Sequence, residues 1–71
     1  MGLSFTEVTI NSSAIRSASY DVVSQVMTVN FTDGSEYSYD GVPPNVFDDF
    51  TGAGSPGSYF NQHIRGSYGY A

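Results

Sequence analysis

The segment SPGSYFNQHIRGSYGY, residues 55–70, carries the side chains best suited to chemistry in this sequence of 71 residues. His63 is the only histidine, so a catalytic triad with an imidazole base would have to use it. Serines and aspartates are plentiful, but their spacing designates no partner for that base. We therefore expect no catalytic residue, and we expect His63 to contact Tyr59, four residues earlier, on a half-buried helix face.

The sequence also offers little for a metal or a cofactor. Asp48 and Asp49 are neighbours, and a helix turns neighbouring residues to different sides, so they do not supply the oxygen cage that calcium needs. There is no cysteine, which excludes disulfides and thiolate metal sites. We expect no metal and no cofactor, and we interpret the two aspartates as a solvated acidic face.

Asn61 and Arg65 are four residues apart and share one side of a predicted helix. One interpretation makes them a polar pair that grips a ligand or a partner, because the planar guanidinium matches phosphate or carboxylate. The favoured interpretation is structural. In it Arg65 lies in the last helical turn, complements the helix dipole and can pair with Asp48 or Asp49.

Tyr37 and Tyr39 share one face of a predicted strand. They belong to the core if helices cover that face, and otherwise they form a stacking platform or a protein anchor. Six tyrosines and five phenylalanines are many for this length, so we expect an aromatic patch at the surface. The order of preference is core, then self-association, then ligand stacking. The candidate binding residues are Tyr37, Tyr39, Asn61, Arg65 and Tyr68.

Charge limits the class of partner. Seven acidic residues face two arginines and no lysine, for a net charge of −5. Proteins that bind a nucleic-acid backbone neutralise several phosphates with lysine and arginine, so nucleic acid is disfavoured. A site for one nucleotide or one unstacked base stays open. The start, MGLSFTEVTI, has no basic region and no long apolar stretch, so we expect no signal peptide there, and no run reaches the roughly 20 apolar residues of a membrane helix. We expect a cytoplasmic protein without membrane contact.

The first half of the chain predicts strands. TEVTI, residues 6–10, alternates between apolar and polar positions, as a strand with one buried face does. In AIRSASY, residues 14–20, the apolar residues break a strict period, which a bulge near Ser17 would reconcile. Residues 21–25 should form a turn. VMTVNFTDGSEYSY, residues 26–39, predicts a hairpin, because Asp-Gly between alternating runs favours a tight turn.

The second half predicts two short helices. PPNVFDDFTG, residues 43–52, has apolar residues at helical spacing, a proline suited to the first turn at Pro44, and Gly52 as its end. A second helix is expected from a cap at Ser55 to a stop at Gly66. The last residues should form an extended tail or an edge strand.

Strands followed by helices predict an α+β domain. We expect an antiparallel meander of three to four strands, followed by two short helices packed on one face. This length makes a single domain, residues 1–71, with a core of about 6–70. Its core is thin, and small domains without disulfides or metals often associate with themselves.

Three segments together resemble the KTSC domain, a small family named for the carboxy-terminal extension of some lysyl-tRNA synthetases. They are SSAIRSASYD, MTVNFTDGSEYSYDGVP and SPGSYFNQHIRGSYGY, and the resemblance runs from about Val8 to Tyr70. The family's Tyr-x-Tyr matches residues 37–39. Its later pattern matches Ser55, Gly57, Tyr59, Phe60, Asn61, Ile64 and Arg65. The resemblance implies a stand-alone bacterial or phage protein, with no established catalytic residues, and RNA binding has been suggested for the family.

We therefore expect a non-catalytic binding domain that acts through protein–protein interaction and forms a homo-oligomer. In a phage, it could disable a host factor in the bacterial cytoplasm, and its acidity would suit a basic partner or a DNA-mimic role. The alternative is binding of single-stranded RNA or a nucleotide, with stacking on Tyr37 or Tyr39 and a phosphate contact from Arg65.

Overall fold

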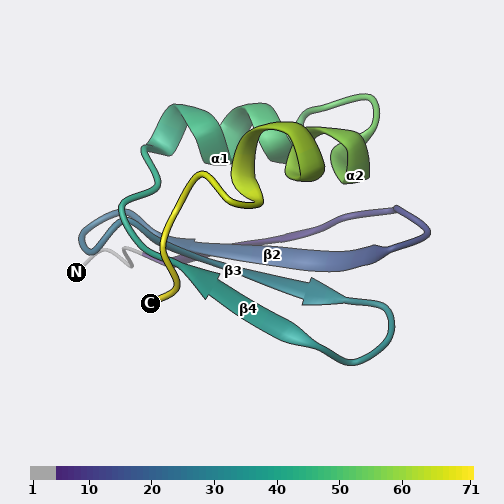
Figure 1. The fold of residues 1–71 in the computed structure, drawn as a ribbon, viewed down its shortest axis with the longest axis horizontal. Coiled ribbons are helices and arrows are strands. Elements are labelled where there is room, and N and C mark those ends of the chain that lie inside the picture. Colours follow the sequence, from purple (N-terminus) through teal and green to yellow (C-terminus); the bar gives the residue numbers. More distant parts are fainter. Residues whose placement is uncertain (1–4) are drawn as a thin grey trace.

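The computed structural model of the protein describes residues 5–71. Four strands form one antiparallel sheet in the order β1-β2-β3-β4, and the helices cover one of its faces (Figure 1). The predicted α+β architecture is confirmed, with four strands in the meander. The strands are β1 (Phe5–Thr9), β2 (Ile15–Asp21), β3 (Val26–Phe31) and β4 (Glu36–Tyr39). The helical elements are α1 (Pro44–Thr51), α2 (Pro56–Tyr59) and the π-helical turn η1 (Phe60–Ile64).

The predicted bulge in β2 is confirmed. The register between β2 and β3 shifts between Ile15 and Ser17, which pair with Phe31 and Asn30. One additional residue on β2 changes the phase of its alternation. Ile15 on one side of the bulge and Ala18 on the other are therefore both buried against the helices.

The hairpin from β3 to β4 turns where the sequence predicts. Gly34 has a φ of +94°, a conformation that glycine adopts without the steric cost of a Cβ. The Asp33 carboxylate accepts hydrogen bonds from the Ser35 backbone N–H at 2.9 Å and from the Ser35 hydroxyl at 2.5 Å. Both bonds lower the pKa of Asp33, and the bond from the Ser35 hydroxyl has the larger effect.

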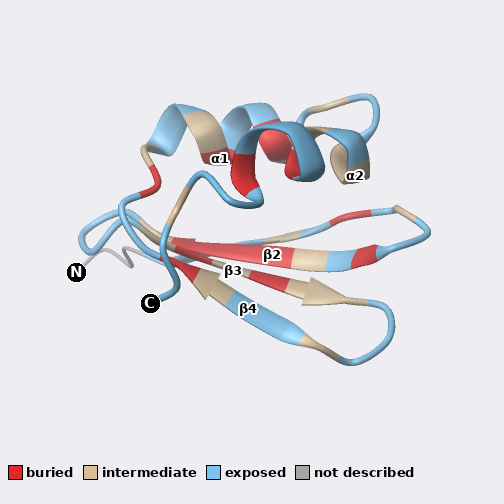
Figure 2. Ribbon diagram, viewed as in Figure 1, coloured by how far each residue is buried: buried red, intermediate tan, exposed pale blue. Residues whose placement is uncertain are grey.

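The face of the sheet under the helices is the core (Figure 2). Met27 and Val29 on β3 are fully buried, opposite Tyr39 and Tyr37 on β4. The two tyrosines share this face, as predicted, but differ in burial. Tyr39 is 3% exposed and belongs to the core, whereas Tyr37 is 45% exposed near the edge of the covered area.

Helix α1 begins and ends as predicted. Pro44 occupies its first turn, and Gly52 closes it by donating its N–H to the Asp48 carbonyl at 2.9 Å. Phe47 is buried and stacks on Tyr20 of β2, with ring centroids 5.0 Å apart. Asp48 and the next residue, Asp49, are exposed, in agreement with a solvated acidic face.

The second helix differs from the prediction in its last turn. After α2 the chain widens into η1, where the Arg65 N–H bonds to the Phe60 carbonyl, five residues earlier, at 2.8 Å. Arg65 follows η1 with extended backbone angles, φ −62° and ψ 121°. The expectation that Arg65 lies in the last helical turn and pairs with Asp48 or Asp49 is therefore wrong. Within residues 5–71 no ion pair joins it to either aspartate.

Candidate binding site

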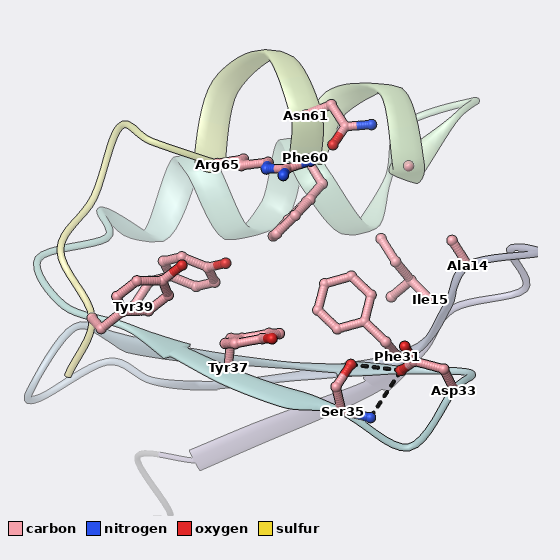
Figure 3. Close-up of a pocket in the computed structure, with 12 residues that line it drawn as sticks. Ala14, Ile15, Phe31, Asp33, Ser35, Tyr37, Tyr39, Phe60, Asn61 and Arg65 are labelled. Carbon is pink, nitrogen blue, oxygen red and sulfur yellow. Dashed lines mark hydrogen bonds between the residues drawn. The ribbon is translucent and has the colours of Figure 1, made fainter.

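A cavity of about 330 Å³ lies between η1 and the end of the sheet formed by β3 and β4 (Figure 3). Five of the twelve residues that line it are aromatic, so we name it the aromatic cavity. The rings that line it belong to Phe31, Tyr37, Tyr39, Phe60 and Tyr70. Its volume falls in the range of small-molecule sites, about 300–1,000 Å³.

The aromatic rings of the cavity contact one another across elements. Phe31 on β3 meets Phe60 on η1 edge to face, with centroids 5.3 Å apart and planes at 76°. Phe31 also meets Tyr37 edge to face at 5.8 Å. Edge-to-face pairs are the favoured geometry for aromatic rings, so Phe31 joins the helix to the edge strand.

The C-terminal tail completes the wall. Asp40 donates its N–H to the Gly69 carbonyl at 2.8 Å, and Tyr70 forms a single antiparallel bridge with Tyr39. The Tyr70 ring lies 5.4 Å from that of Tyr39 and 5.9 Å from that of Tyr37. The tail thus behaves as a minimal fifth strand, between the two alternatives that the sequence left open.

Two tyrosines at the cavity remain accessible. Tyr37 is 45% exposed and Tyr70 is 71% exposed. They fulfil the expectation of an aromatic patch at the surface, because the thin core closes over Tyr39 and leaves these two rings outside it. The patch is continued by a shallow hollow along β4, which is lined by Glu36, Tyr37, Ser38, Tyr70 and Ala71.

Asn61 and Arg65 line the same cavity from the helix side, and Figure 3 places both above its aromatic rings. Both side chains are exposed. Among residues 5–71, Arg65 has no carboxylate within ion-pair distance, although the protein has seven acidic residues. Single π-turns inside helices occur frequently at functional sites. The π-turn brings these two polar side chains to the rim of the cavity.

Tyr68 does not line the cavity. It is half-buried against the core, on the side of Tyr59. The place we expected for it is taken by Tyr70, which was not among the candidate binding residues. Phe31 and Phe60 also line the cavity, and the sequence pattern assigns both to the core. No local signal distinguishes these rings, because the contacts that make them cavity walls join distant segments.

Burial sets the ionisation of the tyrosines at the site. Burial raises the pKa of Tyr39, and the neighbouring Tyr70 and Tyr37 raise it further, while the Arg65 guanidinium opposes the shift. Burial also raises the pKa of Tyr59. At neutral pH both phenols are therefore protonated and can donate a hydrogen bond.

His63 lies outside the aromatic cavity. Its ring contacts that of Tyr59 at 4.5 Å, which confirms the predicted pair, but His63 is exposed and not half-buried as expected. Across residues 5–71 no three His, Cys, Asp or Glu side chains gather as a metal site would require. None of the helices in this same part of the chain is long and apolar enough to cross a membrane.

Comparison with known proteins extends this description. The family model described as KTSC domain matches residues 11–68. A protein of Tsukamurella paurometabola is 46% identical over 56 residues, which cover 79% of this chain and 84% of that protein. A lysine–tRNA ligase of Nostoc punctiforme is 41% identical over 56 residues, but these are only 10% of the ligase. The crystal structure of a KTSC domain protein from Yersinia pestis superposes with a TM-score of 0.88 at 28% identity, covering 94% of each chain.

Proposed function

This chain belongs to the KTSC domain family, and from that premise we propose that it is a small non-catalytic domain that binds a protein partner. The binding surface is the tyrosine-rich area at the mouth of the aromatic cavity. One observation carries the proposal: Tyr37, 45% exposed, lies beside the exposed Tyr70 with ring centroids 5.9 Å apart. Tyrosines are enriched among the residues that dominate the free energy of protein association.

Charge indicates the kind of partner. With a net charge of −5, the protein attracts a basic surface and repels an acidic one at a distance. In a phage setting such a partner would be a host factor. No reaction is assigned to the domain, because His63, the only imidazole, lies exposed and outside the cavity.

Capture of partners from a bacterial lysate, with and without nuclease, tests the proposal. We compare the wild-type protein with Tyr37→Ala and with Ser24→Ala, a control at an exposed polar residue of the β2–β3 turn. Proteins that resist nuclease should be retained by the wild type and by Ser24→Ala and lost from Tyr37→Ala. Equal capture by Tyr37→Ala, or capture that nuclease abolishes, contradicts a protein partner at this surface.

The proposal includes self-association. Phe5 and the two valines of the β2–β3 turn, Val22 and Val23, add exposed apolar surface away from the cavity, at 56%, 50% and 81% exposure. Analytical ultracentrifugation at a few tens of micromolar should detect a homo-oligomer. A monomer at that concentration removes self-association from the proposal without affecting the test with Tyr37→Ala.

A second candidate function is binding of a nucleotide or of single-stranded RNA. It is favoured by the placement of Arg65, without an ion pair in residues 5–71, at the rim of the same cavity as Tyr37. Tyr39 is 3% exposed, so a base would stack on Tyr37 instead. If RNA binds through this one arginine, the logarithm of the association constant should fall with the logarithm of the salt concentration with a slope of only about −0.7. Arg65→Gln should abolish that salt dependence. Absence of binding at low salt eliminates this candidate.

A further inference from the structure

The outer edge of β4 is the part of the molecule that carries a further inference. β4 is the last strand of the sheet, and only β3 pairs with it as a full strand. Its outer edge holds the tail by two backbone hydrogen bonds, from Asp40 N–H to the Gly69 carbonyl at 2.8 Å and from Ala71 N–H to the Ser38 carbonyl at 3.0 Å. An edge of this kind is a template for another extended strand.

The tail is held lightly on that edge. Of residues 67–71 only Tyr68 is half-buried, and the other four are exposed. Tyr70, which sits over the two tyrosines of β4, is itself 71% exposed. A strand that replaced the tail would restore the same backbone hydrogen bonds, so the exchange costs little in hydrogen-bond free energy.

The chain turns between η1 and the tail. Gly66, which follows Arg65 after the end of η1, has a φ of +78° at this turn. In Figure 1 the chain turns after η1, and the last residues then run down to the end of β4. Displacement of Gly69–Ala71 alone, beyond Tyr68, would leave the buried Phe60 and Ile64 of η1 and the packing of Tyr68 against the core in place.

The edge continues past the part that the tail covers. The tail's pairing reaches Ser38, and the strand extends through Tyr37 to Glu36, along the shallow hollow that Ala71 also lines. A longer segment would therefore pair with more of β4 than the tail does. It would also lie against Tyr37, the residue on which the proposed function rests.

The two faces of β4 differ in chemistry. Tyr37 and Tyr39 point to the cavity face, while Glu36 lies on the opposite face, because side chains alternate along a strand. Asp40 follows the strand directly, and both acids are exposed. A segment paired in the register of the tail would set an aromatic side chain toward the tyrosines, one neighbouring side chain opposite Asp40, and the other opposite Ser38 and diagonal to Glu36.

We propose that the protein partner binds as an extended segment that adds to β4 as an antiparallel strand in place of Gly69–Ala71. An aromatic residue of the segment occupies the position of the Tyr70 ring. Of the lysine or arginine residues on its two sides, one lies opposite Asp40 and the other reaches Glu36 diagonally, past Ser38. This inference rests on the proposed function, whose partner it specifies. The tail is then the intramolecular occupant that the partner displaces.

The first experiment uses fluorescence anisotropy with two labelled peptides and the full chain. The probe Thr-Lys-Tyr-Lys-Thr should bind, and Thr-Glu-Tyr-Glu-Thr should bind at least about tenfold more weakly at low salt. Tyr70→Ala should increase the affinity for the lysine peptide by about three- to tenfold, because the tail loses its ring contacts and competes less well. Ser67→Ala, exposed in the same tail, should leave the affinity unchanged. Reduced affinity in Tyr70→Ala, or no binding of the lysine peptide at millimolar concentration, overturns the proposal.

The second experiment locks the tail in place. The variant Asp40→Cys with Gly69→Cys joins two positions whose backbones are hydrogen-bonded, and the chain has no cysteine of its own. Paired positions of antiparallel strands lie within the distance that a disulfide spans. The oxidised protein should lose at least about tenfold in peptide affinity relative to the same protein after reduction, which is its matched control. Equal affinity in both states overturns strand addition.

The two proposals fail in different ways. If the locked protein still captures a lysate partner and Tyr37→Ala does not, the protein-binding function stands and strand addition is wrong. If Tyr37→Ala captures the same partner as the wild type, the proposed function itself is wrong. If the wild type sediments as a dimer and the locked protein as a monomer, the occupant of β4 is the tail of a second copy, which overturns a foreign segment.

Discussion

The ring of Phe60 on η1 meets the ring of Phe31 on β3 edge to face, at 5.3 Å between centroids. The Phe60 ring also lies 5.8 Å from the ring of Tyr39 on β4, so Phe60 joins the π-turn to two strands of the sheet. The same side chain, 6% exposed, belongs to the hydrophobic core and lines the aromatic cavity.

Phe60→Ala should reduce the free energy of unfolding by about 3–4 kcal/mol, because it removes a buried ring and leaves a void between η1 and the sheet. Urea denaturation measures the change. Phe5→Ala is the control of the same chemistry, because Phe5 is 56% exposed, and it should cost less than about 1 kcal/mol. Equal losses in the two variants would mean that the η1–sheet contact contributes nothing specific.

Tyr20→Phe should cost about 1–2 kcal/mol. The Tyr20 hydroxyl donates to the Val42 carbonyl at 2.5 Å, and both residues are buried, so the substitution leaves that carbonyl without its partner. The shape of the ring is unchanged, which separates the hydrogen bond from packing. Tyr37→Phe, at a residue 45% exposed, should stay within about 0.5 kcal/mol of the wild type in the same measurement.

The protein should lose stability at alkaline pH. Burial raises the pKa of Tyr20, Tyr39 and Tyr59 in the folded state above the ordinary value of 10.0. The unfolded chain then ionises first, so the contribution of these phenols is complete below about pH 10 and is lost as the pH rises toward their folded pKa values. The sequence has no lysine and no cysteine, so tyrosines are the side chains that titrate between about pH 9 and 11.5.

Urea midpoints measured from about pH 8 to 11.5 test this dependence. The midpoint should be level at first and should then fall. Tyr20→Phe should show a shallower decline, since it removes one of the three phenols whose pKa is raised in the folded state. A midpoint that stays constant to the end of the series would mean that the phenols are as accessible to solvent in the folded protein as in the unfolded chain.

Gly34→Ala should destabilise the β3–β4 hairpin by about 1–2 kcal/mol. Gly34 has a φ of +94°, which a residue with a Cβ adopts only with strain, although no atom lies within 4 Å of the added carbon. Gly54→Ala is a matched control, since its surroundings are equally open and its φ is not positive. Thermal unfolding should distinguish them, and equal melting temperatures would exclude backbone strain as the reason for glycine at this turn.

Local pattern was sufficient for most elements. The Asp33–Gly34 turn, the bulge near Ser17 and the start of α1 at Pro44 follow from side-chain period and from backbone preferences of single residues. These signals are local, because each depends on a few neighbouring residues and on which face of an element is apolar. The order of strands then leads to an α+β domain, since a sheet with one apolar face needs a helical cover.

The candidate site required more than local pattern. Tyr37, Tyr39, Asn61 and Arg65 meet at the aromatic cavity, but Tyr68 packs against the core and Tyr70 lines the cavity instead. Residues 67–71 contain no period that distinguishes the two tyrosines. The distinction arises from the pairing of the tail with β4, a contact between segments about thirty residues apart in the chain.

The sequence by itself determined which stretches are strands and helices and which faces are apolar, because these depend on intrinsic dihedral preferences and on the alternation of side chains. Only the tertiary structure decided that Tyr39 is sealed and Tyr37 accessible, that a π-turn sets Arg65 outside the helix, and that the tail closes one wall of the cavity. The reason is physical: burial of a ring depends on how far a neighbouring element extends over it, and that distance is set by packing between segments remote in sequence.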